Sequence, residues 1–293
     1  MMNIFAKVSE LLDKQETVAV VTIINHRGSV PRQLAKMCVT KKGETFGTVG
    51  GGCVEGQVVE EAAQMLRSGT RGVAVRSYDL IEEEFGGVGM NCGGKVEFSI
   101  EVVEPTPQLI VAGSGHLSSA IARLADALGF EVTVVDAMAE RKHFPTAKLV
   151  VADFVGTHFQ DMHITESSQI VVVTRHKDDL PSLRAALGTN AGYIGLVGSR
   201  RRVLQTFQQL LSEGFTEKQL ERVNAPVGLN IGAETPEEIA VSILAEIIQR
   251  RRTGANIPAE PMKVNLESVR AAAATRSSNR DQEQSENCNY LGP

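Results

Sequence analysis

The chain has 293 residues, and at roughly 150 residues per domain this length predicts two domains. Lys and Arg number 30 against 35 Asp and Glu, which gives a net charge of -5, and aromatic residues make up only 4%. A broad basic surface with stacking side chains is therefore excluded, and we expect no nucleic-acid partner. The hydrophobic fraction of 42% is enough for buried cores.

The sequence also bears on membrane association and on the redox compartment. No apolar run reaches the roughly 18 residues that a membrane-spanning helix needs, and acidic residues interrupt the amino-terminal pattern. We therefore expect neither a membrane anchor nor a signal peptide. The four cysteines form no C-x-x-C pair and are too few for a disulfide framework, which indicates a cytoplasmic protein. They are Cys38, Cys53, Cys92 and Cys288.

The periodicity of residues 1–105 predicts a first domain of α+β type. Helices are expected near Asn3–Leu12 and over Val54–Leu66, the second directly after three glycines. The connector 104–107 contains two prolines, each of which disfavours helix at the residue before it, and it marks the domain boundary. Strands are predicted over Thr17–Ile24, Lys36–Thr40, Phe46–Val49, Val73–Ser77 and Val96–Val103.

Residues 106–252 alternate apolar strands with helical segments, as a parallel sheet with crossover helices requires. This pattern predicts a doubly wound, Rossmann-like second domain. Thr235, Pro236 and Glu238 form the start signal of a last helix that should end near Arg252. Residues 253–293 have little apolar content, so we expect a mostly disordered tail. The strands are predicted over Leu109–Ala112, Glu131–Val135, Leu149–Ala152, Ile170–Thr174 and Tyr193–Val197.

A glycine motif over 113–118 follows the first of these strands and opens a helix. Gly113 allows a tight turn, and Gly115 lets backbone approach a pyrophosphate at the helix N-terminus. His116, the next residue, is a further candidate binding residue. Asp136, at the end of the next strand, stands where such sites bind a ribose hydroxyl. Ser118 takes the place of the third small residue. The motif predicts a nucleotide site, and the alternative is a nucleotide fold that has lost its nucleotide.

Two cysteines of the first domain are embedded in glycines. In 50–55 the glycines allow backbone N–H groups to close around an anion, and the start of a helix favours the thiolate form of Cys53. Cys92 lies in a second glycine-rich segment, and together the thiols predict one pocket for a soft metal or for sulfur chemistry. The alternative is two unrelated turns. The candidate binding residues are Gly50, Gly51, Gly52, Cys53, Glu55, Cys92 and Gly93.

Two further segments concentrate arginine. Arg27 and Arg32 flank a stiff turn that contains glycine and proline, and guanidinium forks match phosphate or carboxylate groups. In the second domain, Gly198 and Ser199 precede three arginines, Arg200 first, in the first turn of a predicted helix. Cations there oppose the helix dipole, which favours a bound phosphate. The alternative is a solvated basic face, because salt screens exposed charges.

These motifs, in this order, resemble those of the xanthine dehydrogenase accessory factors, the XdhC/CoxI family. The resemblance covers nearly the whole folded chain. The residues that carry it are Gly28–Arg32, Gly50–Glu55, Met90–Gly94, Gly113–His116, Ile194–Arg200 and Ala225–Glu238.

The resemblance implies a cytoplasmic chaperone that binds the molybdenum cofactor, as molybdopterin or its cytosine dinucleotide form, and protects it from oxidation. It further implies that a cysteine desulfurase sulfurates the cofactor, which then enters a xanthine dehydrogenase-type molybdenum hydroxylase. Cys53 and Cys92 would contact molybdenum, while Arg27, Arg32 or Arg200 hold phosphate. A homodimer is expected. The departure at Ser118 concerns only the nucleotide.

Two other classes of function remain as alternatives. A NAD(P)-dependent oxidoreductase would use Gly113, Gly115 and Asp136, but His26, His116 and His176 fall in no dehydrogenase signature. A nucleotide-sensing module would carry out no chemistry. We favour the non-catalytic chaperone, on the hypothesis that thiols of the first domain and cations of the second converge on one anionic guest.

Overall fold

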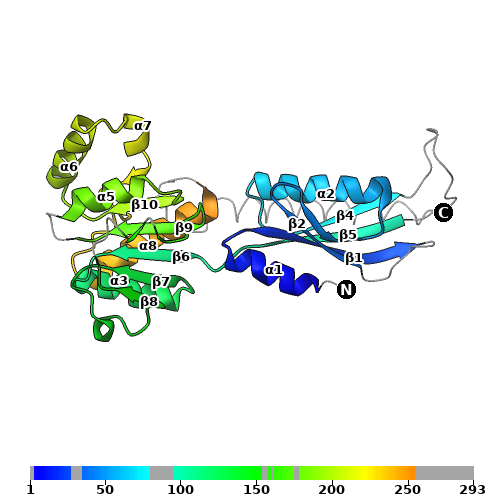
Figure 1. The fold of residues 1–293 in the computed structure, drawn as a ribbon, viewed down its shortest axis with the longest axis horizontal. Coiled ribbons are helices and arrows are strands. Elements are labelled where there is room, and N and C mark those ends of the chain that lie inside the picture. Colours follow the sequence, from blue (N-terminus) through cyan, green and yellow to red (C-terminus); the bar gives the residue numbers. More distant parts are fainter. Residues whose placement is uncertain are drawn as a thin grey trace, which may run out of the picture.

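The structure is a computed structural model that describes residues 3–27, 35–79, 95–153, 158–159, 161–174 and 178–254. It contains an antiparallel sheet followed along the chain by a parallel sheet, and the two lie beside each other along the long axis of the molecule (Figure 1). The predicted fold class is therefore confirmed. Within the described ranges, no helix is long and apolar enough to cross a membrane. Of the predicted tail 253–293, Thr253 belongs to the last helix, and residues 255–293 lie outside the described residues.

The first sheet has the order β3-β2-β1-β5-β4. Helix α2 (Gly52–Arg67) packs on one face, where Val58 and Ala62 join a buried cluster with strand residues such as Phe98. Helix α1 (Ile4–Asp13) packs on the other, where Leu11 contributes to a cluster with Cys38. The strands are β1 (Val18–Arg27), β2 (Lys36–Thr40), β3 (Thr45–Gly47), β4 (Gly72–Asp79) and β5 (Lys95–Val103).

The second sheet is parallel and has the order β11-β10-β9-β6-β7-β8. Numbered within the domain, this is the 3-2-1-4-5-6 order of dinucleotide-binding folds. The sequence predicted five of these strands; it missed β11, whose two residues are too few to show periodicity. The strands are β6 (Gln108–Ala112), β7 (Glu131–Val135), β8 (Leu149–Val151), β9 (Ser168–Val172), β10 (Tyr193–Leu196) and β11 (Val223–Asn224).

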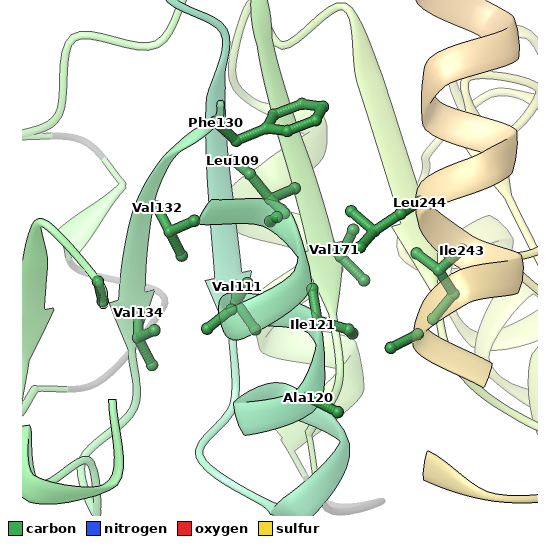
Figure 2. Close-up of a cluster of buried hydrophobic side chains, with 14 of the residues drawn as sticks. Leu109, Val111, Ala120, Ile121, Phe130, Val132, Val134, Val171, Ile243 and Leu244 are labelled. Atoms are coloured by element: carbon green, nitrogen blue, oxygen red, sulfur yellow. The ribbon is translucent and has the colours of Figure 1, made fainter. Parts of the chain in front are cut away.

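Helices cover both faces of this sheet. Leu109 and Val111 of β6 face the side that α3 and α8 bury, as Figure 2 shows, while Ile110 and Ala112 face α5 and α6. This alternation is the period-2 pattern of a strand buried on both faces. The helical segments are α3 (His116–Ala127), η1 (Arg141–His143), α5 (Asp179–Leu187), α6 (Arg200–Ser212), α7 (Glu217–Leu220) and α8 (Pro236–Thr253).

Helix α8 is fixed at its start and in its middle. Thr235 and Glu238 form the predicted capping box, and Pro236 occupies the first turn. The buried carboxylate of Glu246 accepts hydrogen bonds from the Tyr193 hydroxyl at 3.0 Å and from the Gly228 amide at 2.6 Å. Glu246 thereby ties α8 to both β10 and the segment that precedes the helix.

The two sheets have a defined polarity relative to the connector. β5 ends at Val103 and β6 begins at Gln108, so the amino end of β6 lies beside the first domain. All other strands of the second sheet run parallel to β6, and their carboxyl ends form an edge that faces away from the connector. We call this edge of the second sheet the carboxyl edge. The Lys41–Glu166 ion pair (3.3 Å) and a Ser167–Gln15 hydrogen bond (3.0 Å) join the two domains beside the connector, at the amino ends of the parallel strands.

The Glu246 contacts lead to a stability prediction. Glu246→Ala leaves the Tyr193 hydroxyl and the Gly228 amide buried without an acceptor, so we expect a loss of about 2–4 kcal/mol in the free energy of unfolding. The control is Glu237→Ala, on the same helix as Glu246, which removes an exposed ion pair with Arg123 of α3. This substitution should lower the free energy of unfolding by at most about 1 kcal/mol. Denaturant unfolding measures both values. Equal losses would contradict the role of Glu246 as a stabilising buried acceptor.

Candidate functional site

The predicted nucleotide motif lies at the carboxyl edge, between β6 and β9, where the strand order reverses. Gly113 has a φ of +133°, and a Cβ atom at this position would lie 2.3 Å from the Val173 carbonyl oxygen. The close approach of two chain segments thus requires glycine here. Ligands of open parallel sheets bind at such a reversal, so the motif stands at the expected place.

Helix α3 begins beside this turn without a side-chain cap. Gly115 is the N-cap residue and makes no side-chain hydrogen bond to the helix, while His116 is exposed. The first backbone amides of α3 therefore lack a capping side chain, as an anion site requires. Ser118 is fully buried, and its Oγ has no hydrogen-bond partner in the described part of the chain.

Asp136 lies at the adjacent strand end. The Gly113 amide donates to the Val135 carbonyl at 3.0 Å, which places the glycine turn next to this carboxylate. One carboxylate oxygen of Asp136 accepts from the Met138 amide at 2.7 Å and anchors the turn after β7. Gly113, Gly115, His116 and Asp136 are therefore brought together at one edge of the sheet.

The predicted arginine cluster divides into two parts. Ser199 caps α6 by accepting from the Arg202 amide, and the Arg202 guanidinium forms an ion pair with the buried carboxylate of Asp179. A second guanidinium nitrogen donates to the Thr174 carbonyl at 3.0 Å. The charge of Arg202 is thus neutralised inside the protein rather than by a phosphate. Arg200 and Arg201 are exposed at the same edge.

The glycine-cysteine loop of the first domain holds an anion of its own. One carboxylate oxygen of Glu55 accepts from the Thr48 hydroxyl at 2.5 Å, the Val49 amide at 3.0 Å and the Gly51 amide at 2.9 Å. The three glycines have φ values of +137°, +79° and +79°, which side chains rarely adopt. Cys53, in the first turn of α2, is a free and exposed thiol. We call residues 48–55 the glycine loop.

The electrostatics of Glu55 and of Cys38 follow from their surroundings. Partial burial opposes ionisation of Glu55, but hydrogen bonds from Thr48 and the loop amides outweigh it and hold the pKa of this carboxyl below its usual value. Burial raises the pKa of Cys38 to about 11, which keeps this core thiol protonated. Among the described cysteines, Cys53 alone is accessible.

The glycine loop and the carboxyl edge lie at opposite ends of one chain. The exposed Arg27 pairs with Lys95, at the end of β5 opposite Val103 and the connector. Helix α2 runs 16 residues from the glycine loop back to Arg67, shortly before Gly72, which pairs with Val102 beside the connector. Figure 1 shows the two sheets extending in opposite directions from the connector. Within one chain, Cys53 and the cations of the carboxyl edge therefore lie apart, and the predicted convergence of thiols and cations on one guest would require a second protomer. Arg32, Cys92, Gly93 and His176 lie outside the described residues.

Some contributors to these sites are not apparent in the sequence. Thr48 precedes the glycines, but nothing in the spacing shows that its hydroxyl donates to Glu55. Asp179 is separated from Arg202 by 23 positions, so only the fold reveals their pairing. Within the described ranges, no group of three or more His, Cys, Asp or Glu residues is placed to hold a metal ion.

The Glu55 contacts predict a pH-dependent stability. Because the folded-state pKa is lowered, the contribution of the ionised carboxylate is full above the ordinary value of 4.5 and is lost as the pH falls through the folded value. We expect Glu55→Gln to lower the free energy of unfolding by about 1 kcal/mol at pH 7. Unfolding curves from pH 7 to 3 should show this difference shrinking.

Glu60→Gln, on the exposed side of the same helix, is the matched control for this measurement. It should give a smaller and salt-sensitive difference, because an exposed ion pair contributes little. A Glu55→Gln difference that stays constant from pH 7 to 3 would show that the carboxylate charge does not stabilise the loop.

Family models match both parts of the chain. The model described as "XdhC and CoxI family" matches residues 11–79, and the model described as "XdhC Rossmann domain" matches residues 109–247.

Curated relatives share much of this chain. "Molybdenum cofactor insertion chaperone PaoD" of Escherichia coli (strain K12) is 27% identical over 281 residues, covering 83% of this chain and 86% of that protein. A protein of Bacillus subtilis (strain 168) that is named as one subunit of a "Probable xanthine dehydrogenase" is 28% identical. The match covers 85% of this chain and 98% of that protein. "Uncharacterized protein YqeB" of Escherichia coli (strain K12) is 36% identical over 85% of this chain. The chain spans only 46% of the length of YqeB.

Proposed function

Because the chain belongs to the XdhC and CoxI family, we propose that it binds the molybdenum cofactor and delivers it to a xanthine dehydrogenase-type molybdenum hydroxylase. The observation that carries the proposal is the exposed Cys53 thiol on a loop held by Glu55. The similarity to the insertion chaperone PaoD supports it. We also propose residues 1–105 and 106–252 as the two functional units.

The donor set of the first domain fits such a guest. A thiolate is a soft ligand and suits a soft metal. The one accessible thiol among the described residues, Cys53, is too few for a bare ion, which needs several protein ligands, but it suffices for a cofactor that brings its own sulfur ligands. Because Glu55 already holds the glycine loop, Cys53 is presented without a rearrangement. Once delivered, the cofactor supplies the redox centre of the client hydroxylase.

The second domain would hold the phosphate end of the cofactor. The uncapped start of α3 and the exposed Arg200 and Arg201 place positive potential at the carboxyl edge. Asp136 beside Gly113 favours a nucleotide there, either the cytosine dinucleotide form of the cofactor or NAD(P). A nicotinamide oxidoreductase is the second candidate function, but it leaves the glycine loop and Cys53 without a role.

The separation of the two ends bears on assembly. If thiol and phosphate contacts serve one guest, the Cys53 end of one protomer must meet the carboxyl edge of another. We therefore propose a homodimer with two composite sites, related by a twofold axis. The accessible Cys53 end would also face the cysteine desulfurase that sulfurates the cofactor.

Cofactor loading tests the role of Cys53. We expect Cys53→Ala, purified anaerobically, to retain roughly tenfold less molybdenum and pterin than the wild type and to activate the client hydroxylase correspondingly less, because lost ligand contacts cost on this scale. Cys38→Ala removes a buried thiol of the same domain and should load normally once folded. Normal loading by Cys53→Ala would refute the role of the thiol. A panel of alcohols with NAD(P)H tests the oxidoreductase alternative.

Mixed dimers test the composite site. Cys53→Ala and Arg200→Gln/Arg201→Gln should each load poorly alone. After random mixing we expect about a quarter of wild-type loading, because half of the dimers are mixed and each has one intact composite site. Light scattering checks that the wild type is dimeric. A lack of recovery in confirmed mixed dimers would contradict a site shared between protomers.

A further inference from the structure

Outside these sites, a cavity of about 420 Å³ lies at the junction of the two domains. It lies at the amino ends of the parallel strands, on the opposite side of the second sheet from the carboxyl edge. We call it the junction cavity. The residues that carry its charge and polarity are Arg71, Glu104, Glu166, Gln169, Arg250 and Arg251.

The charges of this cavity do not balance. Glu104 accepts from Arg71 at 2.7 Å, and Glu166 forms its ion pair with Lys41 at 3.3 Å. Both acids of the lining therefore have a cation already. Arg250 and Arg251 are half-buried, and within the described ranges the structure gives neither guanidinium a hydrogen bond or ion pair with a carboxylate. Two guanidinium groups therefore line the cavity without a carboxylate in hydrogen-bond or ion-pair contact among the described residues.

The surroundings of Arg251 show that this imbalance has a cost. Its guanidinium lies over the Phe130 ring, 5.2 Å from the ring centroid, in a cation–π contact that attracts the charge but gives its N–H groups no lone-pair acceptor. Burial lowers the pKa of Arg251, and Arg252 and Arg71 add to the effect against the attraction of Glu104. An anion in the cavity would relieve this desolvated charge.

A neutral acceptor lines the same cavity. Gln169 is only 3% exposed. Its side-chain nitrogen donates to the Ser167 carbonyl at 2.6 Å, which fixes the orientation of the amide. The remaining oxygen has no hydrogen-bond partner among the described residues. Buried acceptors are nearly always satisfied, so this oxygen calls for a donor such as a hydroxyl group.

We infer that the junction cavity binds a small phosphate monoester that carries hydroxyl groups, as a sugar phosphate does. A phosphate monoester has a charge close to -2 at pH 7, which matches the two unpaired guanidinium groups. A hydroxyl supplies the donor that Gln169 lacks. The volume suits a small ligand, and sites for such ligands are common at domain junctions. This inference is independent of the proposed cofactor role.

Titration calorimetry on the full-length protein tests the inference. Ribose 5-phosphate should bind, inorganic phosphate should bind more weakly, and ribose should not bind. Arg250→Gln and Arg251→Gln should each weaken ribose 5-phosphate binding by roughly 10- to 100-fold, because each removes a charged hydrogen-bond donor. Arg250→Lys keeps the charge but loses the fork and should lie in between.

Arg252→Gln is the matched control, because Arg252 is the next residue on the same helix, is exposed and does not line the cavity. It should bind as the wild type does. Gln169→Leu should reduce the preference for ribose 5-phosphate over inorganic phosphate. Circular dichroism checks that each variant is folded.

Three results would overturn the inference. One is the absence of ribose 5-phosphate binding to the wild type. Another is an equal loss in Arg252→Gln, which would indicate a diffuse charge effect. The third is a loss confined to Arg200→Gln/Arg201→Gln, which would move the phosphate site to the carboxyl edge.

Discussion

The parallel pairing of the second sheet, together with the short connector 104–107, sets the geometry on which both proposed binding regions depend. β6 begins directly after this connector, so its amino end must lie beside the first domain. Every other strand of the sheet shares this direction. The carboxyl edge, where parallel sheets bind ligands, is therefore directed away from the glycine loop. A guest that contacts both regions would have to bridge two protomers, which is the reason for the proposed homodimer.

Internal carboxylates occupy two places where the sequence suggested an external anion. Glu55 fills the nest of loop amides, and Asp179 neutralises Arg202. Both arrangements obey one rule: a partly buried charge or a set of converging amides acquires a partner from within the chain when the fold supplies one. The consequence for Glu55 is that its carboxylate holds the glycine loop that carries Cys53. For Arg202, the consequence is that the positive potential available to a ligand comes from Arg200 and Arg201.

Local patterns predicted the elements well, and long-range pairing limited the site. The range of β2 and the capping box of α8 follow from alternation and from Thr235, Pro236 and Glu238, all of which act within a few residues. The Rossmann-like order and the need for glycine at 113 were also accessible, because tight turns have a compact signature. The pairing of Asp179 with Arg202 was not, nor was the placement of Gln169 and Arg250 in the lining of one cavity, because such arrangements depend on how strands and helices distant in sequence come together.

The arginines show how the same residue type can be sorted by its partners. Arg71 and Arg202 each have a carboxylate and stabilise the fold, whereas Arg200, Arg201, Arg250 and Arg251 have none in the described part of the chain. Arg200 and Arg201 are exposed, so solvent and salt screen their charges, and the fold tolerates the absence of a ligand there. Arg250 and Arg251 are half-buried in a cavity and cannot rely on screening to the same degree. A bound anion would accordingly stabilise the junction cavity more than the carboxyl edge, although the sequence motifs lie at the carboxyl edge.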